Sequence, residues 1–317
     1  MSEAIERGGA ALDLNAAEVR AADRAARTWE AGECGPIFLG SEAHKRAFCR
    51  MLLDTHNPYR PSIVDWPPLD PEARDRLVSL PIWDIAMQTE GNASLRVLSY
   101  AHTIADPVLR EAIEIDGFEE TRHKQVLSNL VAAYGIRLAP EPEYLPPKNP
   151  EWAFLLAGFC ECVDTFFAFG LFSLAKRSGF FPPELVDTFE PVIQEEGRHI
   201  IFFVNWVAWH RRNLPVWRRV LFAAKIVSVW GFLIWERIGF ARGLDNDGGV
   251  QPGNTPQNNN FVFTGSRAIG SGNVSVATVI DICLSENERR FAGYDPRLLR
   301  PRLMPRVMRF ARRFMRS

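Results

Sequence analysis

Apolar residues recur along most of this chain at the spacing of amphipathic helices, and the alternation typical of β-strands is scarce. Ser41 and Asp106–Pro107 are typical of helix starts, and Gly135 is typical of a helix end. We therefore predict an all-α fold. The expected helices cover residues 41–54, 81–105, 107–134, 151–178, 184–212 with a kink at Pro191, 215–242, and a last stretch after 273.

One connection is too long and too rich in proline to be an ordinary turn. Residues 136–150, "IRLAPEPEYLPPKNP", contain five prolines among 15 residues and cannot form a helix. An extended chain of this length reaches about 50 Å, at roughly 3.3 Å per residue, which is enough to run back along a whole helix. The helices on either side can then lie parallel, as in a four-helix bundle with one long crossover.

Composition divides the chain into five segments. Residues 1–80 form an N-terminal accessory segment, and residues 81–212 form the bundle with its crossover. Residues 213–242 form an accessory helix, and residues 243–273, rich in Gly and Asn, are predicted to be a flexible loop. Residues 274–317 form a C-terminal helix and a basic tail. Accessory helices are thus expected on both sides of the bundle in sequence.

Charge and cysteine content narrow the function only a little. The 37 Lys and Arg residues balance 38 Asp and Glu, and no glycine-rich loop opens a helix, so nucleic-acid binding is not expected. Five scattered cysteines and the lack of a signal-peptide pattern predict a cytoplasmic protein with reduced thiols.

Residues 152–175 and 220–235 are apolar enough to suggest membrane spans. Because Glu161, Asp164 and Lys225 interrupt them, we expect both stretches to be buried in the bundle.

Two five-residue stretches are nearly identical: "EETRH" at Glu119–His123 and "EEGRH" at Glu195–His199. Residues three apart share a helix face, so the second Glu and the His of each copy can bind one ion together. A single such pair is usually solvated, but here the other two bundle helices each carry an acid in apolar surroundings as well. The predicted metal ligands are Glu90, Glu120, His123, Glu161, Glu196 and His199.

A Glu from each of two helices, with a Glu-x-x-His from each of two others, is the ligand arrangement of di-iron and di-manganese carboxylate proteins. Over about residues 81–212 the chain therefore resembles the ferritin-like superfamily. The resemblance implies a ferritin-like four-helix bundle that holds two Fe ions, or one Mn and one Fe, with O2 as co-substrate. Oxygen-rich ligation with two imidazoles suits these metals.

The other residues of the two motifs have two interpretations. Glu119 and Glu195 can hydrogen-bond the ligand His of the opposite motif, and Arg122 and Arg198 can pair with these acids. Alternatively, all four lie on solvated helix faces. The remaining histidines are expected to be unconnected with the site: His44, His56, His102 and His210.

Two polar residues follow Glu161 on its helix. Asp164 shares the face of Glu161 and is expected to support a ligand rather than to bind metal. Thr165 lies one turn after Glu161, where bacterial multicomponent di-iron monooxygenases, which this segment resembles here, have a Thr beside the oxygen-binding pocket. The resemblance implies that Thr165 is catalytic and relays a proton. In the alternative, its hydroxyl bonds back to the carbonyl of Glu161.

The expected function is that of an O2-activating di-iron (or Mn/Fe) oxidoreductase, a monooxygenase or oxidase acting on a small apolar or aromatic substrate. An electron-donor protein and a second copy of the chain, in a homodimer, are the expected partners. Phenylalanines near the ligands are expected to line an apolar substrate pocket, although the same spacing is typical of plain core. They are Phe166, Phe167, Phe169, Phe202 and Phe203.

Two other classes of function remain open. One is a ferroxidase or other iron-handling or peroxide-scavenging protein, and the other is a metal-free helical scaffold. Aryl-amine N-oxygenases of the superfamily typically have a third His one turn before the last ligand Glu. Val192 occupies that position here, which argues against N-oxygenation.

The C-terminal tail, residues 296–317, contains eight Arg and no acid. Wound as a helix, it places Leu303, Met304, Val307, Met308, Ala311 and Met315 on one face. Such a segment can lie on an anionic membrane, bind an acidic partner such as a reductase, or pack back onto the bundle. Peripheral membrane contact through this tail is therefore one expectation.

Overall fold

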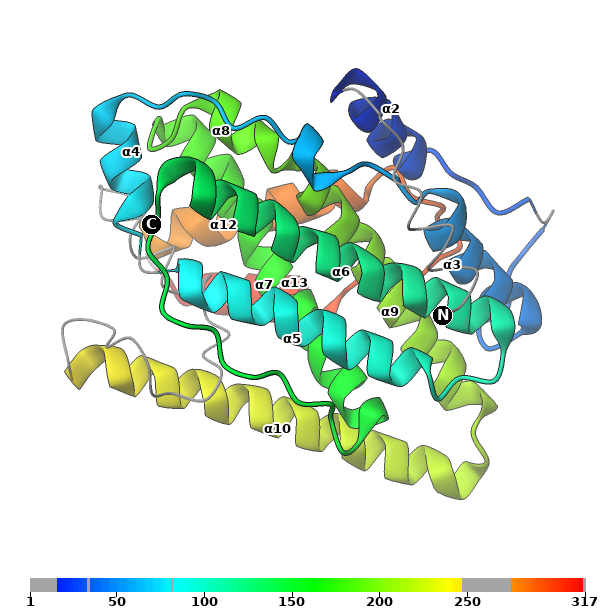
Figure 1. The fold of residues 1–317 in the computed structure, drawn as a ribbon. Helices are drawn as coiled ribbons and strands as arrows, with labels where there is room; N and C mark the ends of the chain where they lie inside the picture. The colour runs from blue at the N-terminus through cyan, green and yellow to red at the C-terminus, as the bar shows by residue number, and fades with distance from the viewer. Residues whose placement is uncertain (1–15, 33–34, 81, 247–274, 316–317) are drawn as a thin grey trace.

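The computed structural model describes residues 16–32, 35–80, 82–246 and 275–315 (Figure 1). Every regular element in these ranges is a helix, which confirms the all-α class. The elements are α2 (Ala16–Arg27), α3 (Glu42–Asp54), η1 (Pro61–Ile63), α4 (Pro71–Val78), α5 (Trp83–Ala101), α6 (Pro107–Tyr134), α7 (Pro150–Ser178), α8 (Pro183–Thr188), α9 (Glu190–Asn213), α10 (Val216–Asn246), α12 (Val276–Phe291) and α13 (Leu303–Arg312).

Four long helices form the centre of the molecule. α5 packs against α6 and α7, and α9 packs against α6 and α7, so the four enclose a common interior. α3 covers α6 and α9 from outside, while α12 and α13 pack against α7. α10 contacts α7 and α9 along one edge of the molecule (Figure 1) and exposes Trp217, Val220, Val227 and Ile234 on its outer side.

The predicted end signals of the central helices are confirmed. The Asp106 carboxylate accepts a hydrogen bond from the Leu109 amide at 2.9 Å, and Pro107 occupies the first turn of α6. Gly135 ends α6 with a φ of 66°, in the left-handed region that glycine adopts without strain. Asn149 caps α7 in the same way as Asp106 caps α6, accepting from the Trp152 amide at 3.1 Å.

The proline-rich connection after α6 is non-helical, as predicted, and runs back along the central helices to the start of α7 (Figure 1). It is fastened to α5 at two points. The Ala139 amide donates to the Asp84 carboxylate at 2.8 Å. The Tyr144 ring lies on Gly91, where a Cβ would come within 2.8 Å of it. Gly91 therefore allows the connection to lie close against α5.

Two predicted helices differ from the structure. The helix expected over 184–212 is split into α8 and α9 at Phe189, and Pro191 lies in the first turn of α9 instead of kinking a longer helix. Proline fits there because a first-turn amide has no partner within the helix. α10 extends to Asn246, so residues 243–246 are helical, whereas the rest of the predicted loop lies in 247–274, outside the described residues.

α7 is, among the described helices, the one long and apolar enough to cross a membrane. Its most apolar window is 78% buried within the protein, against α5, α9, α10 and α12. The prediction that residues 152–175 are buried is thus consistent with the packing of α7. The same prediction for residues 220–235 is wrong, because α10 lies at the edge of the molecule and exposes Val220, Val227 and Trp235. Two hydrophobic clusters flank the interior, a large one beneath α3 and a smaller one around Leu80, Phe181 and Leu185 at the α4–α8 end.

Candidate metal centre

The structure brings the six predicted ligands together in the interior of the four central helices. α5 carries Glu90, α6 carries Glu120 and His123, α7 carries Glu161, and α9 carries Glu196 and His199. They form two groups whose ligand atoms lie within 4.8 Å of one another. The first is Glu90, Glu120, His123 and Glu196, and the second is Glu120, Glu161, Glu196 and His199.

Glu120 and Glu196 belong to both groups and are therefore placed to bridge two ions. Glu90 and His123 serve one position only, as do Glu161 and His199 on the other side. The centroids of the two imidazole rings are 5.7 Å apart. This is the arrangement of a dinuclear carboxylate centre: one terminal Glu and one His for each ion, with two shared carboxylates between them.

Four buried polar atoms in and beside this cluster make no hydrogen bond within the described structure. They are Glu120 Oε1, His123 Nδ1, His199 Nδ1 and Asp116 Oδ1. His199 Nδ1 lies 2.9 Å from Glu120 Oε1, and His123 Nδ1 lies 3.3 Å from Glu196 Oε1. Two ligands at right angles, each about 2.1 Å from an ion, would be about 3 Å apart. Buried unpaired polar atoms are costly, so the residues present fit a pair of bound cations.

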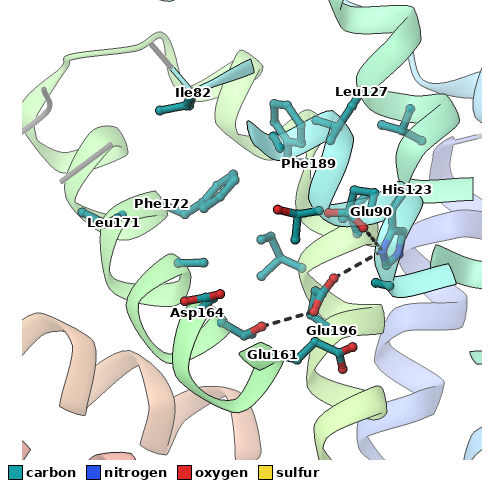
Figure 2. A pocket seen from close by; sticks show the side chains of 18 of the residues that line it. Ile82, Glu90, His123, Leu127, Glu161, Asp164, Leu171, Phe172, Phe189 and Glu196 are labelled. Atoms are coloured by element: carbon teal, nitrogen blue, oxygen red, sulfur yellow. Dashed lines mark hydrogen bonds and ion pairs between the residues drawn. The ribbon is translucent and has the colours of Figure 1, made fainter. Parts of the chain in front are cut away.

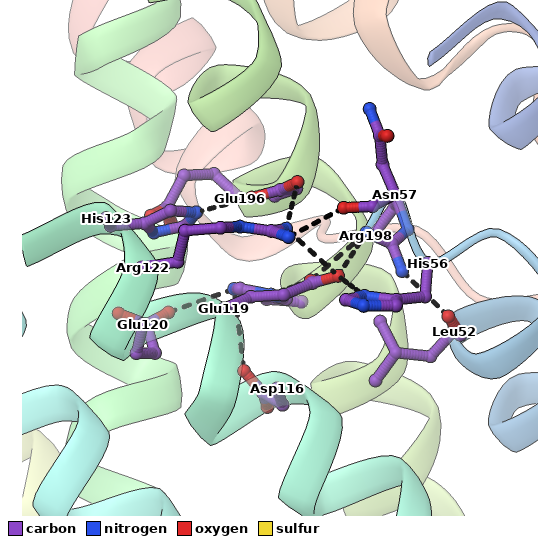
Figure 3. A network of polar contacts seen from close by, with 12 residues as sticks. Leu52, His56, Asn57, Asp116, Glu119, Glu120, Arg122, His123, Glu196 and Arg198 are labelled. Atoms are coloured by element: carbon purple, nitrogen blue, oxygen red, sulfur yellow. Dashed lines mark hydrogen bonds and ion pairs between the residues drawn. The ribbon is translucent and has the colours of Figure 1, made fainter. Parts of the chain in front are cut away.

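Each imidazole is oriented by the carboxylate that precedes the ligand Glu in the opposite motif (Figure 3). His199 Nε2 donates to Glu119 Oε2 at 2.7 Å, and His123 Nε2 donates to Glu195 Oε2 at 2.9 Å. Because Nε2 makes this hydrogen bond, Nδ1 is the nitrogen that faces the cluster and that could bind a cation. The structure therefore contains the predicted hydrogen bonds, in which the first Glu of each motif accepts from the His of the other motif.

The two motif arginines neutralise these carboxylates. Arg198 donates to both oxygens of Glu119 at 3.0 and 3.1 Å, and Arg122 donates to Glu195 at 2.5 Å. None of these four side chains is more than 3% exposed. The alternative of solvated helix faces is therefore wrong. Burial raises the pKa of Glu119, but Arg198 and His199 lower it more, so that its pKa lies well below the ordinary value.

His56 belongs to this network, contrary to the expectation that it is unconnected with the site. Its Nδ1 lies 2.6 Å from Glu119 Oε1 (Figure 3). It comes from the segment after α3, together with the backbone carbonyl of Asn57, which accepts from Arg122 at 2.6 Å. Nothing in the spacing of these residues distinguishes them, because they reach the site only through the packing of α3 and its following loop on α6.

The metal-facing carboxylates repel one another. Burial, and then the charge of Glu196, raises the pKa of Glu120 well above the ordinary value. Burial, and then Glu120, does the same to the pKa of Glu161. Burial lowers the pKa of His123, but contacts with Glu195, Glu196 and Glu90 raise it more. Cations bound between these groups would relieve this repulsion and would displace the protons that the groups otherwise hold.

Thr165 and Asp164 lie beside the ligands on α7. The Thr165 hydroxyl donates to Glu196 Oε2 at 3.2 Å, in contrast to the alternative in which it bonds back to the Glu161 carbonyl. Asp164 accepts from the Cys160 thiol at 3.0 Å and faces the same cavity as Glu161 (Figure 2). Its support of a ligand stays a prediction.

A cavity of about 200 Å³ adjoins the centre (Figure 2). Glu90, His123, Glu161 and Glu196 line one part of it, and most of the remaining wall is apolar. Along α7 the lining runs from Ala157 to Ala175, which is about 27 Å of helix at 1.5 Å per residue. The cavity is therefore elongated and extends from the ligands towards α4 and α8.

The residues that line this cavity differ from the predicted ones. None of the five predicted phenylalanines lines it, so this part of the expectation is wrong. Phe167 is half-buried, and the other four are at most 2% exposed and belong to the close-packed core: Phe166, Phe169, Phe202 and Phe203. Aromatic residues do occur in the cavity wall, but they come from the helix ends and the α8 region. They are Trp83, Phe172, Phe181 and Phe189.

Comparison of the chain with protein-family models, with curated proteins and with solved structures found no match. The fold and the site together define an all-α protein whose four central helices enclose a buried cluster of carboxylates and imidazoles. The geometry of that cluster is the basis for assigning a function.

Proposed function

We propose that this protein is an O2-activating oxidoreductase with a ferritin-like bundle and a di-iron, or Mn/Fe, carboxylate centre. Its reaction is the oxidation of an apolar organic substrate, as a monooxygenase or oxidase. The observation that carries the proposal is the pair of overlapping ligand groups, in which Glu120 and Glu196 are shared and each group has its own Glu and His. Two ions held by these two overlapping groups would supply the electrons that reduce O2.

The donor set supports iron or manganese over softer metals. Four carboxylates and two imidazoles provide mainly oxygen ligands, and the four cysteines of the described residues are free thiols outside both ligand groups. The two motif arginines, Arg122 and Arg198, pair with Glu195 and Glu119 and not with the candidate ligands. The negative charge of the ligands is thus left to the metal ions.

The cavity supports an organic substrate over iron storage. Storage of iron needs a hydrophilic path for ions, whereas the wall beside this centre is dominated by Leu, Ile, Val, Ala and Phe. An elongated apolar cavity with carboxylates and a hydroxyl at one part of its wall suits a molecule that presents one C–H region to the metals. The Thr165 hydroxyl, hydrogen-bonded to Glu196 and facing the cavity, is placed to hold or pass a proton there.

The first test is anaerobic loading with Fe(II), followed by metal analysis and by O2 consumption. The wild-type protein is expected to hold two ions per chain, because the two groups define two positions. Glu120→Ala and Glu196→Ala each remove a shared ligand and should abolish binding of both ions. Glu114→Gln, which changes another buried acid of α6 outside both groups, is the matched control and should keep both ions.

Each alternative has its own outcome in this experiment. Full metal content in both Ala variants contradicts the ligand assignment. Accumulation of many irons per chain with O2 favours an iron-handling protein, and a wild-type protein that binds no metal favours the helical scaffold.

A further inference from the structure

The cavity beside the candidate metal centre is closed at one end. Figure 2 shows Ile82 and Phe189 there, on the side away from Glu161. The wall at this end is apolar, and its side chains are at most 7% exposed: Leu77, Leu80, Phe181 and Leu185. The packing of the α4 and α8 regions therefore separates this end from water.

The opposite end of the cavity lies between α5 and α7. Arg96 is the last lining residue of α5, and Ala157 is the first of α7. One turn beyond Arg96, Tyr100 of α5 stacks on Phe154 of α7, with 4.6 Å between the ring centroids. Arg96 and Ala157 therefore belong to the same end of the cavity.

Arg96 is the one described lining residue that carries a permanent positive charge. Its side chain is half-buried, and burial lowers the pKa of Arg96 more than the nearby Cys160 and Glu236 raise it. These neighbours thus offset only part of the cost of burying the guanidinium. An anion bound at this end would offset more of that cost.

The acids of the cavity wall lie between Arg96 and the closed end. They are Glu90, Glu120, Glu161, Asp164 and Glu196. An anionic group of a substrate would meet like charge among these acids, and it would lose its hydration at the apolar end. The Arg96 end is therefore the part of the wall that suits an anion. A planar guanidinium can bind a carboxylate through two parallel hydrogen bonds.

We propose that the substrate is an amphiphilic carboxylate: Arg96 binds its carboxylate, and its hydrocarbon chain extends past the candidate ligands into the closed end. This inference rests on the proposed function, because it names the class of substrate for the same site.

The length of the wall fits such a chain. Along α5 the lining runs from Trp83 to Arg96, which is about 20 Å at 1.5 Å per residue. An extended chain of about 12 carbons measures about 15 Å, at roughly 1.3 Å per carbon for C–C bonds of about 1.5 Å. Glu90 lies about 9 Å before Arg96 along the helix. The candidate ligands would therefore face an internal carbon of the chain and not its end.

Equilibrium dialysis with radiolabelled ligands tests this binding. Dodecanoate is the probe, and dodecan-1-ol is its neutral counterpart with the same chain. The wild-type protein, with and without Co2+, should bind one dodecanoate per chain, at least about tenfold more tightly than dodecan-1-ol. Hexanoate, whose chain is too short to reach the closed end, should bind at least about tenfold more weakly than dodecanoate.

Variants of Arg96 separate binding of the carboxylate from a structural role. Arg96→Gln should weaken dodecanoate binding at least about tenfold and leave the affinity for dodecan-1-ol unchanged, because it removes only the charged partner of the carboxylate. Arg96→Lys keeps the charge and should keep most of the dodecanoate affinity. Arg50→Gln changes an arginine of α3 that is 59% exposed and outside the cavity, and as the matched control it should bind both ligands as the wild type does.

The outcomes separate this inference from the proposed function. If Arg96→Gln weakens both ligands equally, or neither, Arg96 does not hold the carboxylate and the inference is wrong. Tighter binding of dodecylamine than of dodecanoate also overturns it, because the acids would then set the polarity of the site. A protein that binds two metal ions but no dodecanoate keeps the proposed centre and loses this inference. A protein that binds dodecanoate through Arg96 but takes up no Fe(II), Mn(II) or Co2+ keeps the binding site and loses the proposed centre.

Discussion

At the scale of single residues, the most constrained feature of this protein is the proton on each ligand imidazole. Glu119 and Glu195 are acceptors fixed by buried arginines, and they hold that proton on Nε2. With a cation in the cluster, Nδ1 would then be the nitrogen that donates its lone pair. Without a cation, the surrounding acids raise the pKa of both imidazoles, which favours a proton on Nδ1 as well. Because burial alone would favour neutral acids, Arg198 and Arg122 are what keep these carboxylates charged.

Replacing Glu119 with Gln should weaken metal binding without removing any ligand. The amide can still accept from His199, but it no longer holds the proton on Nε2 by charge, and it leaves Arg198 buried beside a neutral group. We expect metal affinity to fall by about 10–100-fold and the free energy of unfolding to fall by about 3–5 kcal/mol. Metal titration and urea unfolding of the metal-free protein measure the two effects separately.

Glu114→Gln, a buried acid of the same helix outside the network, is the control for Glu119→Gln. Wild-type metal affinity in the Glu119 variant would show that His199 needs no charged partner.

Residues of the site differ in how far their roles can be inferred from sequence. Four of the six candidate ligands are predictable because a spacing of three places a Glu and a His on one helix face, and because the pattern occurs twice. The other two, Glu90 and Glu161, are predictable as acids in apolar surroundings on the remaining two helices. His56 and Asp116 are not predictable in this way. His56 reaches Glu119 only through the fold, across 63 positions, and Asp116 resembles any helical acid until His199 is placed opposite it.

At the scale of helices, Glu151 in the first turn of α7 connects three elements. It accepts from His210 Nε2 on α9 at 3.0 Å and from Lys225 Nζ on α10. These contacts, His210 first, lower the pKa of Glu151 to about 2. A carboxyl whose pKa is lower in the folded than in the unfolded state stabilises the protein above the unfolded value of about 4.3. That contribution is lost as the pH falls towards the folded value.

Glu151→Gln should therefore destabilise the protein in a pH-dependent manner. At pH 7 we expect the free energy of unfolding to fall by about 1–3 kcal/mol, allowing for partial solvent screening of the half-buried side chain. The difference from wild type should shrink as the pH is lowered from 4.5 towards 2, because the wild-type carboxyl becomes protonated there. Urea unfolding at several pH values measures this.

Glu288→Gln is the matched control for Glu151→Gln, since Glu288 pairs with Arg309 at the surface, where its side chain is 65% exposed. Its effect should be near zero at every pH. A Glu151 effect that is the same at pH 3 as at pH 7 would contradict the assignment to charge.

Helix boundaries could be predicted where a cap defines them and not elsewhere. Asp106 and Gly135 define α6 through contacts within one turn, so the sequence is sufficient there. The break at Phe189 is different, because Phe189 fills a place against Trp66 and Phe172. The places where two helices come so close that only glycine fits also depend on the tertiary structure. At Gly158 of α7, for example, a Cβ would come within 2.3 Å of the Phe203 ring on α9.

At the scale of the whole molecule, α13 has one of the roles considered for the basic tail, because it packs back onto the rest of the protein. It packs on α12 and α7, and Arg309 and Arg312 form ion pairs with Glu288 and Asp281 of α12. Its outer side nevertheless exposes four large apolar residues at helical spacing, between 44% and 75% exposed. They are Leu303, Val307, Phe310 and Phe314, with Arg302, Arg306 and Arg313 exposed beside them.

This surface fits an anionic membrane, because apolar side chains would enter the interface while the arginines contact lipid headgroups. The double variant Phe310→Ser/Phe314→Ser should reduce binding to phosphatidylglycerol vesicles by about tenfold or more in a flotation assay, and phosphatidylcholine vesicles should bind neither protein. Phe38→Ser removes an equally exposed aromatic residue, 74% exposed, outside α13 and should have no effect. Equal flotation of the double variant and the wild type would exclude α13 as a lipid-binding surface.

The sequence by itself was sufficient to predict the all-α class, the long central helices, the caps of α6, the long connection after α6 and the positions of the six candidate ligands. The caps and the doubled Glu-x-x-His motif follow from interactions between residues within about four positions of one another, and the connection follows from its prolines. The tertiary structure alone decided which atoms were left unpaired, where the cavity runs, and that His56 and Asp116 contact Glu119 and His199. Those features depend on how helices rotate and pack against one another, and on the collapse of Phe166, Phe169, Phe202 and Phe203 into solid core beside a cavity whose aromatic wall comes from other residues.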